Sequence, residues 1–323
     1  MKDKIEESQR ILRLAADMSK KYYGKPLIIT YSGGKDSDVM LHLAMSCLDK
    51  DEFEVLNNHT TVDAPETVYH IREVFKDLVG GGIKAKVEYP KDKDGNPISM
   101  WKLIVDKGIP PTRLARYCCA VLKESKTPNR IAALGVRADE SAKRQGRDTF
   151  GVRGGSYRKA IFFSLDHTEE VHRESLEHEG EENGSVWDCT LIKVMKEQGD
   201  TVVNPIYTWT DADVWKYIRE NNIKVNPLYE RGYKRVGCIG CPLATYGHVI
   251  KEFMDYPKYE DAYKRTFQRM IDKRRADGKD VRESWKDGEA VFDWWIEKWK
   301  HETRGQMTFD FKEGKDGTYR KSD

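Results

Sequence analysis

The sequence contains no apolar segment long enough to cross a membrane. A spanning helix needs about 20 consecutive apolar residues, and no run in the 323 residues approaches that length. The first ten residues, MKDKIEESQR, also lack the apolar core of a secretory signal. The sequence has almost no excess of one charge sign, because its 56 Lys and Arg residues nearly balance its 54 Asp and Glu residues. The net charge of +2 does not by itself predict nucleic-acid binding. We therefore expect a cytoplasmic protein with no membrane partner.

Two common kinds of site are missing from the sequence. The eight histidines show no metal-ligand spacing, and the Gly-x-x-x-x-Gly-Lys pattern of a Walker A loop is absent. No internal repeat is present. A histidine-based metal centre, a P-loop NTPase and a repeat protein are thus not the expected classes.

Apolar residues instead follow an alternating strand and helix pattern. Helical spacing predicts a first helix over 4–22, and later segments predict further strands at 26–31, 53–58, 83–89 and 131–136, with helices from the loop after Tyr31 through Leu48 and over 65–78. Such alternation predicts an α/β fold, a parallel twisted sheet with helices on both faces.

The rest of the chain divides by composition. We expect an α/β nucleotide-binding domain over 1–245, a helical subdomain over 246–302 and a disordered tail over 303–323. The segment 139–189 is first basic and glycine-rich, then acidic, which indicates a mobile or partner-binding insertion or, alternatively, two solvated loops of opposite charge. Thr210 and Asp213 predict a capped helix start, and Trp295 and Trp299, one turn apart, predict a packing face more than a base-stacking platform.

Ser32-Gly-Gly-Lys-Asp-Ser37 lies between the second predicted helix and the strand before it. Glycines allow backbone N–H groups to turn toward an anion, and the following helix adds the positive end of its dipole. Lys35 supplies a full charge, the two serines supply hydroxyl donors, and Asp36 could hold Mg²⁺ or cap the helix. The segment predicts a phosphate-binding loop.

This loop resembles the pyrophosphate loop of the adenine-nucleotide alpha-hydrolase-like ATP pyrophosphatases. That group includes phosphoadenylylsulfate (PAPS) reductases, tRNA thiolation enzymes and the sulfur-inserting ATPases of DNA phosphorothioation. Four further segments resemble the PAPS reductase branch, although the first of them is a loosened match: 61–67, 135–141, 204–215 and 226–233. The resemblance covers about residues 26–245.

The resemblance implies an adenine-nucleotide site. Its implied members are Tyr31, Ser32, Gly33, Gly34, Lys35, Asp36, Ser37, Asp63, Glu66 and Arg137, with Lys35, Asp36 and Arg137 as the catalytic residues. Arg137 also suits this role by position, because α/β sheets bind ligands beyond the carboxyl ends of their strands and a guanidinium matches phosphate or sulfate. The alternative for Arg137 is a surface salt bridge.

Six cysteines include two clusters, Cys118-Cys119 and Cys238-Ile-Gly-Cys241. Four thiolates suit tetrahedral zinc or a [4Fe–4S] centre, and reduced metal-free thiols are a third reading. The same order occurs in iron–sulfur adenylylsulfate reductases and phosphorothioation ATPases, and that resemblance favours [4Fe–4S]. Cys47 is expected in the core, and Cys189 is either a sulfur carrier or structural.

One element of the resemblance is missing. Sulfonucleotide reductases attack sulfate with a cysteine in a C-terminal Glu-Cys-Gly-Leu-His segment, whereas this sequence has no cysteine after Cys241. We therefore expect an iron–sulfur ATP pyrophosphatase that binds ATP and Mg²⁺ and adenylates an acceptor for sulfur transfer. The partners implied are a sulfur donor such as a cysteine desulfurase and a nucleic-acid acceptor. The alternatives are a reductase of adenylylsulfate or PAPS that takes its thiol from Cys189 or a partner, and a nucleotide-binding module without turnover.

Overall fold

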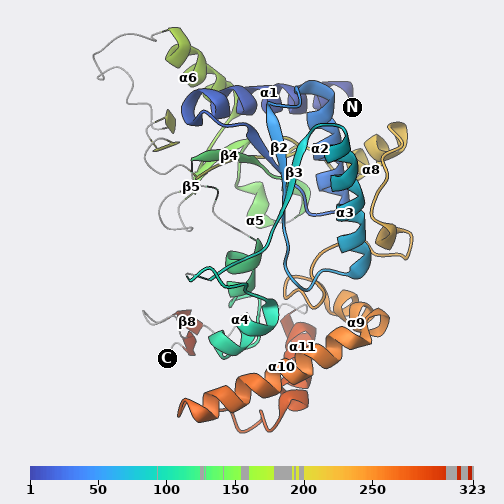
Figure 1. Ribbon diagram of the computed structural model, residues 1–323, viewed down its shortest axis with the longest axis vertical. Helices are drawn as coiled ribbons and strands as arrows, with labels where there is room; N and C mark the ends of the chain where they lie inside the picture. Colours follow the sequence, from blue (N-terminus) through green and yellow to red (C-terminus); the bar gives the residue numbers. More distant parts are fainter. Residues whose placement is uncertain are drawn as a thin grey trace. The chain divides into compact units, whose positions relative to one another are not determined.

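A computed structural model describes residues 1–92, 94–123, 127, 129–140, 142–153, 160–177, 191, 192, 194, 195, 200–302, 311–313 and 319–321. Side chains are not described for 142, 143, 153, 299–302 and the last two segments. The chain forms two compact units (Figure 1), the first made of residues 1–57, 65–88 and 126–236, and the second of residues 58–64, 89–125 and 237–323.

The first unit is built on a seven-stranded sheet with the order β3-β2-β1-β4-β7-β5-β6. Strand β1 pairs in parallel with β2 and β4, and β4, at the centre of the sheet, pairs in parallel with β7. The strand bounds are β1 Leu27–Thr30, β2 Phe53–Asn58, β3 Lys84–Glu88, β4 Arg130–Ala133, β5 Phe150–Arg153, β6 Ala160–Phe163 and β7 Asp200–Val203. The predicted α/β fold class is confirmed.

Strands β5 and β6 were not expected from the sequence. They pair antiparallel with each other, and β5 pairs antiparallel with β7 at the end of the sheet. Both belong to the predicted insertion 139–189, together with η2 Ala138–Glu140, α5 Ala142–Gln145 and α6 Leu165–Glu177. This part of the insertion is therefore ordered secondary structure, while Ser141, 154–159 and 178–189 lie outside the described residues.

The helices of the first unit bury the central strands on both faces. Leu27, Ile28 and Ile29 follow one another in β1 and are all buried, which requires cover on each side of the sheet because neighbouring side chains point oppositely. Helix α1 packs on α2 and β4, α2 also on α8, and α3 on β3. The bounds are α1 Lys2–Tyr23, α2 Lys35–Cys47, α3 Pro65–Gly80 and α8 Asp211–Glu220.

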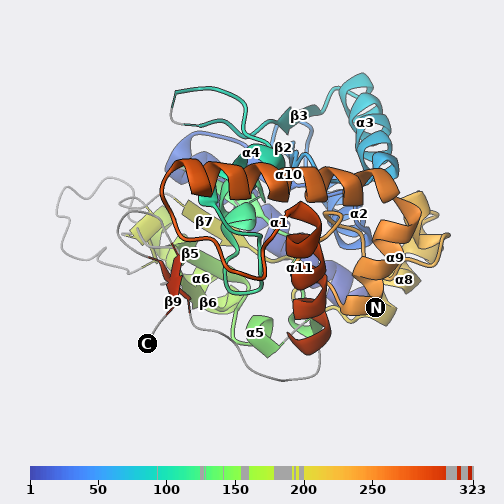
Figure 2. The same cartoon turned by 90° about the horizontal axis from the view of Figure 1, so that it is seen from below.

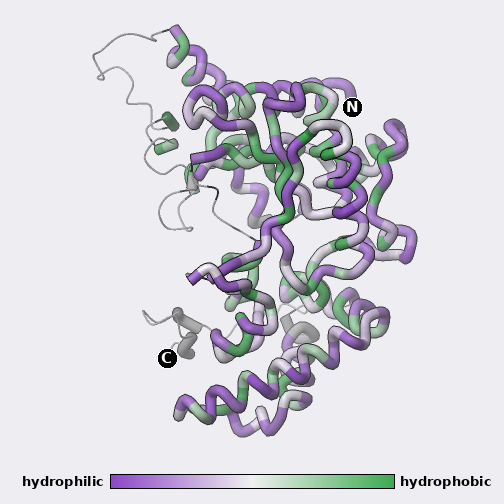
Figure 3. The backbone as a smooth tube through the Cα atoms, viewed as in Figure 1, coloured by the Kyte–Doolittle hydropathy of each residue, from purple (hydrophilic) through white to green (hydrophobic). Residues whose placement is uncertain are grey.

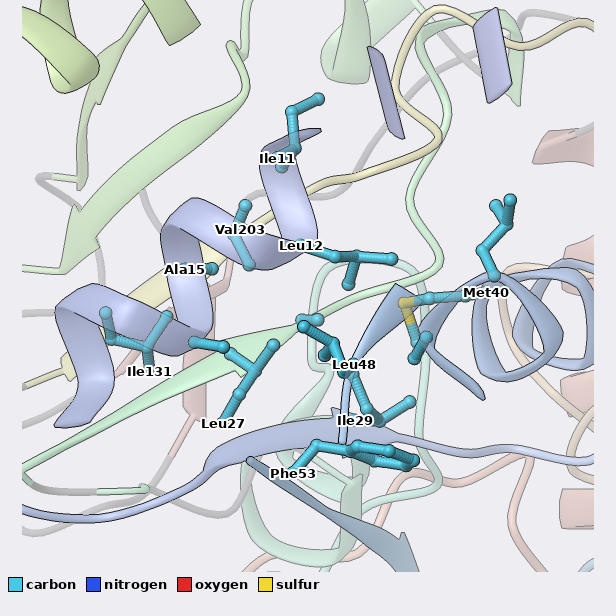
Figure 4. Packing of buried hydrophobic residues seen from close by; sticks show 14 of the residues in the cluster. Ile11, Leu12, Ala15, Leu27, Ile29, Met40, Leu48, Phe53, Ile131 and Val203 are labelled. Carbon is cyan, nitrogen blue, oxygen red and sulfur yellow. The ribbon is translucent and has the colours of Figure 1, made fainter. Parts of the chain in front are cut away.

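The core of the first unit joins α1 and α2 to the sheet. Figure 4 shows Leu12 of α1, Ile29 and Phe53 of the strands and Met40 of α2 among the residues of one buried cluster. Within this unit the buried indole of Trp209 donates a hydrogen bond of 3.0 Å to Ser8 Oγ of α1. The predicted start of α8 is confirmed, since Thr210 Oγ1 accepts from Asp213 N and the Asp213 carboxylate accepts from Thr210 N.

The second unit consists mainly of helices around an aromatic core. Helix α10 packs against α4 and α11 (Figures 1 and 2), and Trp295, Tyr263, Phe253 and Phe267 interlock with ring centroids 4.8–6.3 Å apart. Trp295 is thus a packing residue as predicted, while the side chain of Trp299 lies outside the described ones. The bounds are α4 Met100–Lys107, π-helix η1 Cys119–Lys123, α9 Tyr246–Asp255, α10 Pro257–Ala276 and α11 Gly288–Glu302.

The division into units differs from a boundary drawn at residue 245. Residues 58–64 and 89–125 leave the sheet region to join the C-terminal helices, so the chain passes between the units several times. In the segment expected to be a disordered tail, the structure has two short antiparallel strands, β8 Phe311–Glu313 and β9 Tyr319–Lys321.

Hydropathy follows the same organisation. Figure 3 shows hydrophobic colour in the strands of the first unit and mixed colour along α10, as expected for a helix with one buried face. None of the helices within the described ranges is long and apolar enough to span a bilayer.

Candidate functional site: a glycine loop and a four-cysteine region

The glycine loop, residues 32–37, connects β1 to the first turn of α2 and is held closed by Ser37. The Ser37 hydroxyl donates to Gly34 O at 2.7 Å and accepts from Gly34 N at 3.2 Å and Ser32 N at 3.3 Å. The helix that follows is 13 residues long, and its N-terminal dipole end therefore faces the loop. The predicted order of strand, glycine loop and helix is therefore present in the structure.

Two glycines allow the loop to approach its neighbours closely. Gly33 has φ 72°, in the left-handed region, and a Cβ there would lie 2.9 Å from Ile71 Cγ1. Gly135, just beyond β4, packs against the backbone of the loop, since a Cβ there would lie 3.3 Å from Asp36 C and O. A side chain at Gly33 would push the loop away from α3, and one at Gly135 would push the loop away from the segment after β4.

The loop is braced by two residues that were not among the predicted site residues. Asn226 is fully buried and donates to Gly33 O at 3.1 Å and to Thr67 Oγ1 at 3.0 Å. Tyr229 accepts a hydrogen bond of 2.9 Å from the backbone N–H of Lys35, and burial raises the pKa of its phenol. The Asn-Pro-Leu-Tyr segment 226–229 was the available signal, and its contacts show that it fixes the loop.

Four charged side chains meet at the mouth of the loop. Arg137 Nε lies 2.6 Å from Asp36 Oδ1, and Arg137 Nη2 lies 3.1 Å from Asp211 Oδ1. Lys35 Nζ lies 3.0 Å from the same Asp211 oxygen and 3.4 Å from Asp36 Oδ2. The Lys35 and Arg137 side chains are only 7% and 4% exposed. The structure therefore brings the three predicted catalytic residues together and adds Asp211 to them.

Arg137 retains capacity for one further acceptor. Its Nη1 atom is buried without a hydrogen-bond partner among the described residues and lies 3.5 Å from Asp139 Oδ2. A buried guanidinium N–H without an acceptor is costly. An anionic oxygen at this position would satisfy it, which agrees with Arg137 as a ligand-binding residue more than as a surface salt bridge.

A buried polar network lies under the loop. Tyr31 donates to Asp38 Oδ1 at 2.5 Å, and His70 Nε2 lies 3.0 Å from the Tyr31 hydroxyl and 3.3 Å from Asp38 Oδ1. Burial is the largest cause that raises the pKa of Asp38, and it also raises the pKa of Tyr31. Tyr31, a predicted nucleotide-binding residue, thus directs its hydroxyl into this network.

Two other predicted nucleotide-binding residues have interaction partners outside the group of Lys35, Asp36, Arg137 and Asp211. Glu66 forms an ion pair with Arg231 within the first unit. Asp63 belongs to the second unit, where its carboxylate accepts from Thr60 N at 3.1 Å and its backbone pairs with Cys238.

All four predicted metal-binding cysteines belong to the second unit. Cys118 is buried, and Cys119, Cys238 and Cys241 are half-buried. A hydrogen bond between the neighbouring thiols lowers the pKa of Cys119 to about 6, with help from Arg116, and the same bond raises the pKa of Cys118. The charges of Cys119, Cys238 and Cys241 also raise the Cys118 pKa, so the two clusters, about 120 residues apart in sequence, share one region.

The Cys238–Cys241 turn is fixed on every side within the second unit. Ile239 N donates to Val62 O at 2.8 Å, and its carbonyl accepts from the Tyr263 hydroxyl at 2.9 Å. Gly240 N donates to Glu252 Oε2 at 2.9 Å, and the other oxygen of this buried carboxylate lies 3.1 Å from His248 Nε2. A turn held this way directs its two cysteines from a rigid base.

The donor chemistry of this region suits a sulfur-ligated metal. Four soft thiols lie in one region, burial raises the pKa of Cys238 to about 12, and a bound metal would offset that cost by stabilising the thiolate. As placed, no three Cys, His, Asp or Glu side chains of the described part of the chain converge as ready metal ligands. Cys47, expected in the core, is only partly buried and packs against the core of the first unit, and Cys189 lies outside the described residues.

A known protein family matches the part of the chain that contains these residues. The model of the phosphoadenosine phosphosulfate reductase domain family matches residues 26–244. The chain belongs to this family. The match begins just before β1 and ends after the Cys238–Cys241 turn, so it includes the glycine loop, Arg137 and both cysteine pairs.

The individual relatives are distant or local. An uncharacterised protein of Methanocaldococcus jannaschii is 24% identical over 281 residues, which cover 86% of this chain and 46% of that protein. The adenosine 5′-phosphosulfate reductase of Anoxybacillus flavithermus is 38% identical over 56 residues, covering 17% and 24% of the two chains. The chain spans about half the length of the first curated relatives it matches.

Among solved structures, the PAPS reductase of Candida auris in complex with phosphate aligns with a TM-score of 0.43. The alignment has 18% sequence identity and covers 72% of this chain and 88% of that chain.

Proposed function

We propose that this chain is an ATP pyrophosphatase of the PAPS reductase family that activates an acceptor by adenylation for sulfur transfer. The observation that carries the proposal is the glycine loop, in which a helix N-terminus, buried Lys35 and buried Arg137 meet at one mouth. The family match and the local identity to adenosine 5′-phosphosulfate reductases support an adenine nucleotide as the ligand.

The residues of the loop have distinct roles in this proposal. Lys35 and Arg137 stabilise the negative charge that develops on the departing pyrophosphate, because buried cations at fixed positions act in a site that excludes water. Ser37, Asn226 and Tyr229 hold the loop so that its amides do not reorganise during the reaction. Asp36 supplies an oxygen ligand for Mg²⁺, which would neutralise phosphate charge when bound.

A [4Fe–4S] cluster on Cys118, Cys119, Cys238 and Cys241 forms the second part of the proposal. Such a cluster would relay or hold sulfur, or brace the second unit. The proposed partners are a sulfur donor, such as a cysteine desulfurase, and a nucleic-acid acceptor.

Pyrophosphate release from ATP tests the nucleotide part. We expect Mg²⁺-dependent release by the wild type and a loss of about 100-fold or more in the Lys35→Ala variant, as for removal of a charge that stabilises a transition state. Lys102→Ala is the matched control, since this exposed lysine pairs only with Asp92 among the described contacts. Sulfite release from adenylylsulfate without pyrophosphate release from ATP would replace this proposal with a reductase.

Anaerobic purification tests the cluster. We expect absorbance near 400 nm, with iron and sulfide that are lost in Cys241→Ser but kept in Cys47→Ser, because Cys47 packs beside the core of the first unit. Zinc in place of iron, or neither metal in an anaerobic preparation, would contradict the assignment.

A further inference from the structure

Asp211 is a carboxylate at the loop mouth that was not among the predicted site residues. It is the first residue of α8, and a single oxygen, Oδ1, lies 3.0 Å from Lys35 Nζ and 3.1 Å from Arg137 Nη2. This oxygen therefore occupies the point where the two buried cations converge. A phosphate oxygen of a ligand would bind at the same point, between the two cations.

Carboxylates are already paired with both cations at the loop mouth. Lys35 and Arg137 are each paired with both Asp36 and Asp211, and Arg137 also lies 3.5 Å from Asp139, so two positive charges face three negative charges. An anion that approaches this mouth can reach Arg137 Nη1 directly, but it must displace Asp211 to reach Lys35 Nζ and Arg137 Nη2.

Asp211 is the carboxylate that can leave. Its side chain is 55% exposed, whereas that of Asp36 is 20% exposed and makes the shortest ion pair, 2.6 Å to Arg137 Nε. The backbone N–H of Asp211 stays anchored on Asp139 Oδ2 at 3.2 Å. The Asp211 side chain can therefore rotate into solvent without unwinding α8.

We infer that Asp211 is a specificity-determining residue that makes the loop select the divalent-cation complex of a pyrophosphate group over the metal-free anion. The metal-free anion must break the Asp211 pairs and then lie beside the released negative charge. A complex with Mg²⁺ brings two positive charges, and carboxylate oxygens are the ligands Mg²⁺ prefers, so the released Asp211 and Asp36 face an attractive partner instead.

The inference rests on the proposed function only for the class of ligand, the anionic end of an adenine nucleotide. Inorganic pyrophosphate is therefore the probe, with affinity measured by calorimetry once with a chelator and once with Mg²⁺. The matched control is Glu220→Gln at the far end of α8, which changes the net charge equally and loses only the exposed pair with Lys216. Thermal melting of each variant checks that it folds.

For Asp211→Asn we expect pyrophosphate to bind about tenfold more tightly than to the wild type when the chelator is present, because a full negative charge beside the ligand is removed. With Mg²⁺ the affinity should stay equal or fall, so the ratio of the two affinities drops at least about tenfold, while Glu220→Gln keeps the wild-type ratio.

Unchanged or weaker metal-free binding by Asp211→Asn would overturn the inference, as would a wild type that binds no pyrophosphate under either condition. A wild type that shows the expected binding pattern but releases no pyrophosphate from ATP would refute the proposed function and leave the role of Asp211 standing.

Discussion

Gly240 offers a direct test of how the Cys238–Cys241 turn is held. Its φ is 71°, and a Cβ there would lie 3.0 Å from Trp295 Cη2 and 3.1 Å from Phe253 Cζ and Tyr263 Cε2. Alanine at this position therefore meets two separate costs, the left-handed backbone and the contact with three packed rings.

The two costs can be estimated and separated. A non-glycine residue in the left-handed region costs roughly 1–2 kcal/mol, and an added methyl group in a packed core costs about 1–3 kcal/mol, so Gly240→Ala should lose about 2–5 kcal/mol. Gly278→Ala is the control, because Gly278 has φ 65° and no atom within 4 Å of its Cβ position. It carries the backbone cost alone, and the difference between the variants isolates packing.

Urea unfolding followed by tryptophan fluorescence measures both variants, since buried Trp285 and Trp295 report on the second unit. Iron content after anaerobic purification should fall in Gly240→Ala and not in Gly278→Ala, because only the first displaces the cysteine turn. Equal stability of the two variants, within about 0.5 kcal/mol, would refute the packing argument.

Three other predictions use buried polar groups. Glu252→Ala should cost about 1–3 kcal/mol in urea unfolding because Gly240 N–H loses its buried acceptor, and Glu252→Gln should lose less because it keeps an oxygen there; equal losses would contradict this role. Ser8→Ala should cost a similar amount by leaving the Trp209 indole N–H without a partner, and an unchanged unfolding midpoint would argue against it. Burial raises the pKa of Asp38 above its ordinary 3.8, so the folded state loses stability as pH rises through and above that value. Asp38→Asn lacks this titration, so the stability of this variant relative to the wild type should increase between pH 4 and 7. A stability difference that stays constant over this range would refute the pKa shift.

Residues near one another in the sequence gave the reliable predictions. The buried strand before the glycine loop and the Thr210–Asp213 cap both depend on groups within a few residues. Backbone geometry links such residues directly, so side-chain type and spacing are sufficient.

The apolar pattern of the sequence did not predict contacts between segments that are distant in the chain. Strands β5 and β6 pair antiparallel inside a segment whose charge and glycine content suggested mobile loops. Hydrophobic periodicity indicates which residues are buried, but it does not indicate which strands pair with each other.

The sequence by itself determined which reactive groups this protein carries, namely a glycine loop with Lys35 and four thiols in two pairs. Only the tertiary structure decided what surrounds that chemistry: Tyr229 and Asn226 bracing a loop more than 190 residues away, and Asp211 balancing its cations. The reason is physical. A loop's own conformation is local, whereas the charge and rigidity around it depend on chain segments that meet only when the sheet and helices pack.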